Sequence, residues 1–234
     1  MKNWFAVCVG LTTLALAPVA RPADIVGTIT LKGTPPAEIP ITPLMADPTC
    51  GAMHKTTPTT HFYVVGPHGE LADVVVSLKG VTGKSTGASA PPVVLDQKGC
   101  LYTPQILAIQ TGQKLLVRNS DDCIHNVHAT PTVAGNEEHN DAQMAGGADL
   151  TYTFPRPEMF LRFKCDVHPW MFAWVSVFDG PYYGVSGPDG KFIIKNVPPG
   201  KYTVVADHRK LGSQTQDVEV KDSDVTVNFT FEVK

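Results

Sequence analysis

The sequence is poor in charged residues, which make up 18% of its 234 positions, against about 25% in an average soluble domain. Lys and Arg number 19 and Asp and Glu number 22, so the formal net charge is −3. Without a basic surplus the chain has little with which to hold a phosphate backbone, and we expect no nucleic-acid partner. Hydrophobic residues make up 43%, which is typical of a folded chain rather than a disordered one.

The sequence also lacks a sustained helical periodicity from Ile25 onward, apart from a polar stretch near residues 136–147. Instead, short alternating or β-branched runs recur, separated by turn residues that include 20 Gly and 20 Pro. This spacing predicts an all-β chain built as a sandwich. Examples of these runs are IVGTITLKG, LADVVVSLKG, PQILAIQTG, MFLRFKC, MFAWVSVF and KYTVVAD.

Residues 1–20 have the order of a secretory signal: Lys2, then an apolar run, then small residues. The run is short for a membrane span, so cleavage after Ala20 or Ala23 is favoured over an uncleaved membrane anchor. We therefore expect a periplasmic or secreted protein with no stable membrane span after signal removal. Export would place Cys50, Cys100, Cys123 and Cys165 in an oxidising compartment where disulfides persist.

The composition changes near Gly180, and residues 181–234 are expected to form a second, small β-sandwich. This segment resembles carboxypeptidase regulatory-like and transthyretin-like modules. The resemblance implies a fold and indicates no function. The residues that carry it are Gly190, Phe192, Ile194, Val197, Pro198, Pro199, Gly200 and Tyr202.

The strongest motif places Cys165, His168 and Met171 at intervals of three, with His125 about forty residues upstream. One thiolate, two imidazoles and a thioether are the ligand set of a trigonal copper site with a weak axial ligand. Such a set suits both Cu(I) and Cu(II), so little must move when an electron arrives. The predicted strands 159–164 and 172–178 flank the loop and would hold it at one end of a sandwich.

Residues 71–180 resemble the cupredoxins of the amicyanin and plastocyanin type. The segments that carry the resemblance are VVVSLKG, YTPQILAIQTGQKLLVRNSDDCIHNVH and the ligand loop. The resemblance implies a Greek-key sandwich, with residues 21–70 as an N-terminal strand segment outside it. It implies one type 1 copper per chain, held by His125, Cys165, His168 and Met171. It also implies that Asn126 braces the ligand loop near the thiolate. Two acidic residues and a Cys precede His125 where cupredoxins commonly carry less polar residues.

Several of these residues have a second interpretation. Cys165 could be a buried thiol or half of a disulfide, and Met171 alone would more often be a core residue. His128 could replace His125, but only one can serve because they face opposite sides of a strand; the family pattern selects His125. His54 could join a second metal site, although no partners for it are evident. The most direct interpretation of the remaining histidines is that they lie on the surface: His61, His68, His139 and His208.

Three cysteines remain once Cys165 is assigned to the metal, and an odd number cannot all pair within one chain. Similar exported cupredoxin-like proteins suggest a Cys50–Cys100 disulfide, with Cys123 free. Bridges from Cys50 or from Cys100 to Cys123 stay open on the sequence alone.

The function expected from these features is electron transfer between redox protein partners, without enzyme activity. Multicopper oxidases and copper nitrite reductases flank the Cys ligand with His, whereas Lys164 and Asp166 stand here and no His-x-His pair occurs. The alternatives are copper delivery, or a partner-binding or glycan-binding sandwich with incidental copper, whose aromatic residues would be Tyr182 and Tyr183. Delivery proteins are usually rich in Met or His, and only six Met occur.

The expected docking face consists of Pro169 and Trp170. Trp170 would form an apolar rim around the exposed edge of His168, and a small apolar contact releases easily. The alternative is that Trp170 packs under the C-terminal sandwich and fixes the two modules.

Overall fold

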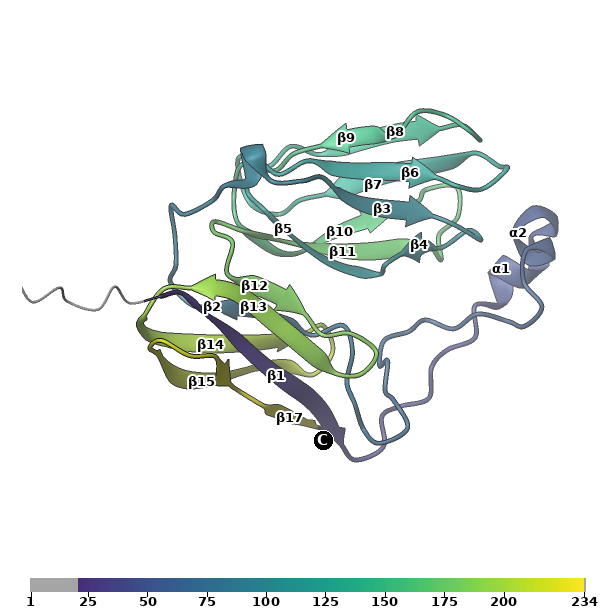
Figure 1. Cartoon of the computed structure of the whole chain (residues 1–234). Coiled ribbons are helices and arrows are strands. Elements are labelled where there is room, and N and C mark those ends of the chain that lie inside the picture. Colours follow the sequence, from purple (N-terminus) through teal and green to yellow (C-terminus); the bar gives the residue numbers. More distant parts are fainter. Residues whose placement is uncertain (1–20, 234) are drawn as a thin grey trace, which may run out of the picture.

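The computed structural model describes residues 21–233, which form two β-sandwiches with little helix (Figure 1). The all-β prediction is confirmed. The proposed signal, residues 1–20, lies outside the described part. In residues 21–233 no helix is long and apolar enough to cross a membrane. The strands are β1 (Ala23–Lys32), β2 (Val75–Leu78), β3 (Val93–Gln97), β4 (Tyr102–Thr103), β5 (Ile106–Gln110), β6 (Leu115–Asn119), β7 (His125–Thr130), β8 (His139–Gln143), β9 (Leu150–Tyr152), β10 (Glu158–Lys164), β11 (Phe172–Phe178), β12 (Tyr183–Val185), β13 (Lys191–Val197), β14 (Gly200–His208), β15 (Gly212–Val220), β16 (Val225–Thr226) and β17 (Phe229–Glu232).

The first sandwich packs the sheet β4-β3-β6-β9 against the sheet β5-β11-β10-β7-β8. The chain passes repeatedly from one sheet to the other, with β6 and β9 in one and β5, β7 and β10 in the other, as in Greek-key connections. Alternate residues of β7 are buried, so one face of this strand lines the core. The core contains the proposed ligands Cys165 and Met171 beside Phe154 and Phe163.

The second sandwich has its own core and recruits strands from both ends of the chain. Its sheets are β13-β1-β16, with β17 also paired to β1, and β12-β2-β14-β15. The chain passes from the first sandwich to the second between β11 and β12, near residue 180, whereas β1 and β2, on either side of residue 70, both belong to the second sandwich. The segment VVVSLKG was expected to begin the cupredoxin-like part, but its strand β2 pairs with β12 and β14 in the second sandwich. The order of segments in the sequence did not predict the sandwich to which β2 belongs. Strand pairing depends on burial and register, and it can join segments that lie far apart in the chain.

Two short helices, α1 (Thr42–Ala46) and α2 (Pro48–Ala52), cover one end of the first sandwich (Figure 1). Residues 41–54, called the cap below, bury Ile41 and Leu44 in the core of that sandwich. Asp47 begins α2 by accepting the backbone N–H groups of Thr49 and Cys50 at 2.9 and 2.8 Å. A short 3-10 helix, η1 (Gly87–Ser89), lies in the connection between β2 and β3.

The polar stretch 136–147, in which a helix was considered, instead contains β8, which pairs with β7 in register. Tertiary pairing overrides the local pattern at this point.

The two sandwiches meet through aromatic and cationic side chains. The Arg209 guanidinium lies 4.0 Å from the centroid of the Trp174 ring, and the Lys210 ammonium lies 3.9 Å from that of Phe62. His208, expected on the surface, is buried and stacks on Tyr63. Burial lowers the pKa of His208 to about 4, so this imidazole is neutral near pH 7.

Candidate metal centre

Hydrogen-bonded strand pairs place the proposed ligands at one end of the first sandwich. β10 pairs with both β7 and β11, and Lys164 at the end of β10 is opposite His128 and Phe172. His125 begins β7, and Cys165 follows β10 directly. Because β7 and β10 are antiparallel, the start of one lies beside the end of the other. The sheet therefore brings His125 to the loop that carries Cys165 and His168.

The three side chains converge on one another inside the protein. Nδ1 of His125 lies 3.0 Å from Nδ1 of His168, and Sγ of Cys165 lies 3.8 Å from Nδ1 of His168. His125, Cys165 and His168 are only 0%, 2% and 7% exposed. Each offers one ligand atom, and the three atoms all lie within 4.8 Å of one another.

The outer nitrogen of each imidazole faces away from the other two ligand residues. Nε2 of His125 lies 2.9 Å from Oδ2 of Asp121, and Nε2 of His168 lies 3.6 Å from Sγ of Cys50. An ionised carboxylate has no proton to donate, so Nε2 of His125 carries one and its Nδ1 is free to bind a metal. The Nδ1 atoms of both imidazoles face the same small volume.

Two Nδ1 atoms 3.0 Å apart need a proton or a metal ion between them, because two bare lone pairs at that distance would repel. Metal–nitrogen and metal–sulfur bonds are about 2.0 and 2.3 Å. The Nδ1–Nδ1 and Sγ–Nδ1 separations, 3.0 and 3.8 Å, are each shorter than the sum of two such bonds. A single ion therefore fits among the three atoms, and one thiolate with two imidazoles is a donor set suited to copper.

Asp121 fixes the orientation of His125 and is a site residue that the sequence analysis did not identify. Its carboxylate also accepts the backbone N–H groups of Gly99 and Cys100 at 2.6 and 2.7 Å. Burial alone would raise the pKa of Asp121, but these hydrogen bonds and His125 hold it below its ordinary value. Burial would likewise lower the pKa of His125, but Asp121 and Cys165 raise it. The signal in the sequence was the acidic residue four positions before the ligand.

The surroundings of the Cys165 sulfur favour its anionic form. The backbone N–H groups of Asn126 and His168 both donate to Sγ, each at 3.3 Å. Burial would raise the pKa of Cys165, but His125 and these N–H groups lower it. The side-chain oxygen of Asn126 accepts the backbone N–H of Asp166 at 3.0 Å, so Asn126 contacts the ligand loop with both backbone and side chain.

Met171 lies fully buried at the end of the same loop. Its backbone N–H donates to the carbonyl of His168 at 2.9 Å, and its carbonyl accepts the N–H of Cys165 at 3.2 Å. These bonds close residues 165–171 as a compact turn against the core. The thioether as axial ligand stays a prediction.

His128 is separate from the three converging ligand atoms. Its Nδ1 lies 2.7 Å from Asp166 and its Nε2 lies 2.6 Å from Glu138. His54 is also elsewhere, with Nε2 bound to the carbonyl of Gly99 at 2.7 Å.

The edge of His168 that the docking prediction left exposed is covered by the cap. Burial, together with the neighbouring His125, lowers the pKa of His168. Trp170 is half-buried, with its ring centroid 5.1 Å from that of His168. The Trp170 indole N–H donates to the carbonyl of Cys100 at 3.1 Å. Trp170 thus packs against the cap disulfide rather than under the second sandwich, while Pro169 is exposed.

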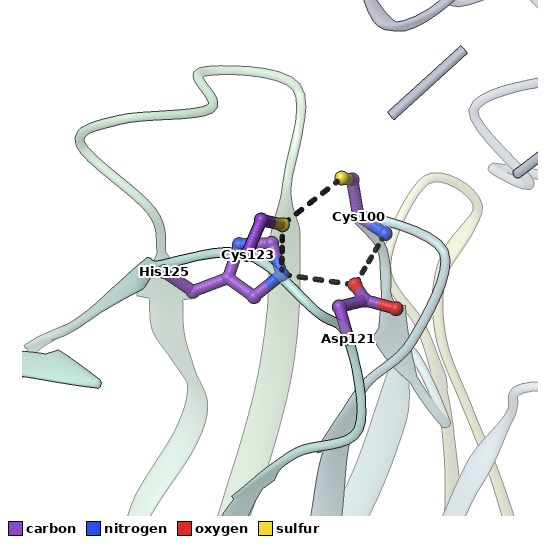
Figure 2. Close-up of side chains that lie close together, drawn as sticks. All are labelled: Cys100, Asp121, Cys123 and His125. Atoms are coloured by element: carbon purple, nitrogen blue, oxygen red, sulfur yellow. Dashed lines mark hydrogen bonds and ion pairs between the residues drawn. The ribbon is translucent and has the colours of Figure 1, made fainter. Parts of the chain in front are cut away.

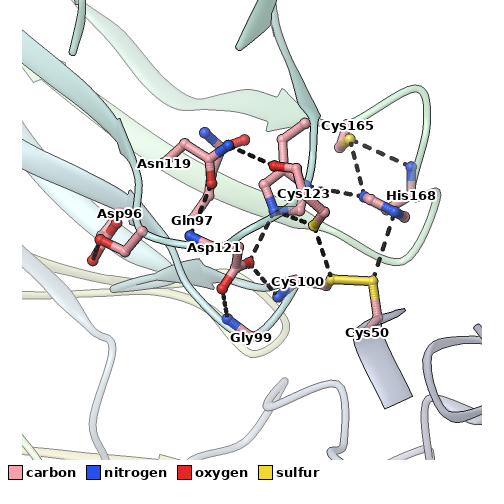
Figure 3. A network of polar contacts seen from close by, with 12 residues as sticks. Cys50, Asp96, Gln97, Gly99, Cys100, Asn119, Asp121, Cys123, Cys165 and His168 are labelled. Carbon is pink, nitrogen blue, oxygen red and sulfur yellow. Dashed lines mark hydrogen bonds and ion pairs between the residues drawn. A yellow bond between two sulfur atoms is a disulfide. The ribbon is translucent and has the colours of Figure 1, made fainter. Parts of the chain in front are cut away.

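Cys50 and Cys100 form a disulfide that attaches α2 to the turn between β3 and β4 (Figure 3). Within residues 21–233, Cys123 and Cys165 lie outside disulfides. Cys123 lies beside His125, Asp121 and Cys100 (Figure 2). This second cluster is a poor metal site, because the Cys100 sulfur is in the disulfide and Asp121 already accepts three N–H groups. Burial and the charge of Asp121 raise the pKa of Cys123.

No protein-family model matches the chain, and no curated protein matches it. Among solved structures it is similar to a Cu-containing nitrite reductase from Thermus scotoductus SA-01, with 22% identity and a TM-score of 0.34. That alignment covers 38% of this chain and 23% of the reductase. A Cu(I) structure of an amicyanin mutant aligns with 19% identity and a TM-score of 0.33, over 44% of this chain and 97% of amicyanin. At such scores the likenesses carry no functional argument, and the site geometry must supply it.

Proposed function

We propose that this protein carries single electrons through one type 1 copper bound by His125, Cys165, His168 and Met171. The observation that carries the proposal is the convergence of two imidazole nitrogens and one cysteine sulfur in a buried site. Copper bound there would supply one-electron chemistry by alternating between Cu(I) and Cu(II).

The chain's own residues would keep the ligands in place during that alternation. Asp121 holds the proton of His125 on Nε2, so Nδ1 stays available. The N–H groups of Asn126 and His168 stabilise the negative sulfur of Cys165. Because these partners lie on paired strands and a closed turn, and because burial excludes water, little reorganisation is needed when the charge changes.

The same features support a carrier over an enzyme. With Met171 as fourth ligand the metal would have no open position for a substrate, whereas catalytic metal sites keep one. The binding-module alternative is weaker, because Tyr183 stacks on Phe178 and its hydroxyl donates to Gln113, 3.3 Å away. The Tyr183 side chain is therefore engaged in contacts within the protein and less available to a ligand.

The Cys50–Cys100 disulfide supports export to an oxidising compartment, periplasmic or extracellular. The partners would then be redox proteins of that compartment, with Pro169 as part of the docking face.

The test is the visible and electron-spin spectrum of the mature protein loaded with Cu(II). We expect an intense thiolate-to-copper charge-transfer band, which Cys165→Ser and His125→Ala abolish. His128→Ala is the matched control and should keep the band, because His128 faces Asp166 and Glu138. A colourless wild-type protein with full copper occupancy would refute the proposal.

A further inference from the structure

A free thiol lies beside the disulfide that holds the cap. Sγ of Cys123 is 4.0 Å from Sγ of Cys100, whose disulfide partner is Cys50 (Figure 3). Thiol–disulfide exchange proceeds by attack of one sulfur on a neighbouring disulfide sulfur. Cys123 therefore lies next to Sγ of Cys100, and a bond between these two sulfurs would release Cys50.

The two segments that would become bridged are already tied together. Asp121 lies in the loop with Cys123, and its carboxylate accepts the N–H groups of Gly99 and Cys100. A disulfide needs its sulfur atoms about 2.0 Å apart, so the Cys100 and Cys123 sulfurs must approach by roughly 2 Å from their 4.0 Å separation. The loop between β6 and β7, residues 120–124, is irregular and short, and can supply this movement more readily than a strand.

The existing disulfide lies directly against the proposed metal ligand. Cys50 Sγ is 3.6 Å from Nε2 of His168, which is only 7% exposed under the cap. Besides the disulfide, the cap is held by its buried Ile41 and Leu44 and by the bond from His54 to Gly99. Loss of the covalent link would leave non-covalent contacts alone to keep His168 covered.

We propose that Cys123 replaces Cys50 as the disulfide partner of Cys100, and that this exchange removes the covalent link that holds the cap over His168. Cys123 gives up its proton and its sulfur bonds to Sγ of Cys100. The Cys50–Cys100 bond breaks, its electron pair leaves with Cys50, and Cys50 takes up a proton. One disulfide and one thiol are present before and after, so no oxidant or reductant is consumed. The consequence for electron transfer rests on the proposed copper site, whereas the exchange itself does not.

The experiment maps disulfides in the copper-free mature protein. The folded protein is held at neutral pH, alkylated with iodoacetamide at intervals, acidified and digested without reduction. We expect two populations: alkylated Cys123 with a Cys50–Cys100 bridge, and alkylated Cys50 with a Cys100–Cys123 bridge. The second should be lost in Cys123→Ser and retained in the matched control Cys165→Ser, which removes the other described free thiol.

A wild-type protein that shows only the Cys50–Cys100 bridge at every interval would overturn the proposal. A Cys50–Cys123 bridge would overturn it as well, because the cap would stay tethered. Hydrogen exchange gives a second readout. In Cys50→Ser, residues 41–54 should exchange faster than in the wild type, and unchanged protection would contradict the unlocking. Because no copper is present, failure of the copper proposal would leave these outcomes unaffected.

Discussion

Oδ2 of Asp121 lies 2.9 Å from Nε2 of His125. The same carboxylate accepts the N–H of Cys100, so one buried anion links a proposed metal ligand to the turn that carries the cap disulfide. The orientation of His125 and the anchoring of the cap therefore depend on a single side chain.

Replacing Asp121 with Asn should weaken copper binding by about 10- to 100-fold, as removal of a partner of a ligating His does. An amide can present its NH₂ to Nε2, which favours the wrong tautomer of His125. A competition titration against a chelator measures the change. Asp122→Asn is the control, because Asp122 is exposed and adjacent. Equal affinities in both variants would contradict the role given to Asp121.

The pH dependence of stability should reflect the buried His208 and the half-buried Asp73. Burial lowers the pKa of His208 to about 4, below its unfolded value. Between pH 4 and about 6.5 the unfolded chain binds a proton that the native state does not. His208 therefore makes the free energy of unfolding fall as the pH drops through this window.

Asp73 acts in the opposite direction. Burial raises its pKa to about 6, so from about pH 4 to 6 the native state holds a proton that the unfolded chain has lost. Its contribution to stability falls as the pH rises. Urea unfolding at pH 4.5 and 6.0 should show a steeper gain with pH in Asp73→Asn than in the wild type, and a smaller gain or a loss in His208→Gln. Parallel changes in all three proteins would refute this assignment.

Removing the Cys50–Cys100 bridge should cost about 4 kcal/mol of unfolding free energy in the chain-entropy model, because it closes a sequence separation of 50 residues. The double variant Cys50→Ala/Cys100→Ala, unfolded in urea, measures this loss. Cys123→Ala provides the comparison and should cost much less. A loss below 1 kcal/mol would mean that the cap is held by its apolar contacts alone.

Trp170→Ala should reduce stability by about 2 kcal/mol, somewhat less than for a fully buried ring. The change removes the packing on His168 and the hydrogen bond to Cys100. Val167→Ala, at a position 52% exposed in the same loop, should change stability little. Denaturant midpoints distinguish the two variants. A neutral Trp170→Ala that slows electron exchange would instead restore the docking-rim hypothesis.

The sequence identified the metal-binding loop because its chemistry is local. Cys165, His168 and Met171 lie within seven residues, and the strands that flank them have clear alternation. It did not reveal that the cap covers His168, because that contact joins α2 to a loop 118 residues away. Nor did it place β1 and β2 in the second sandwich, since an alternating strand such as β1 and a fully buried strand such as β2 could each pack in either core. Hydrophobic pattern fixes which face of a strand is buried, while the choice of partner depends on long-range packing.

The pairing of β1 with β16 and β17 also has a consequence for the order of synthesis. The backbone N–H of Asp24 donates to Oδ1 of Asp224, and that of Thr28 donates to Oδ1 of Asn228, each across 200 positions. A ribosome releases residues of the first sandwich, up to β11, well before those partners exist. During that interval β1 has only its bonds to residues 69–71, so most of this apolar strand lacks a strand partner, and such segments aggregate unless they are shielded. Among the described strands, β1 therefore waits longest for its first strand partner, because β13, β16 and β17 all follow β11 in the chain.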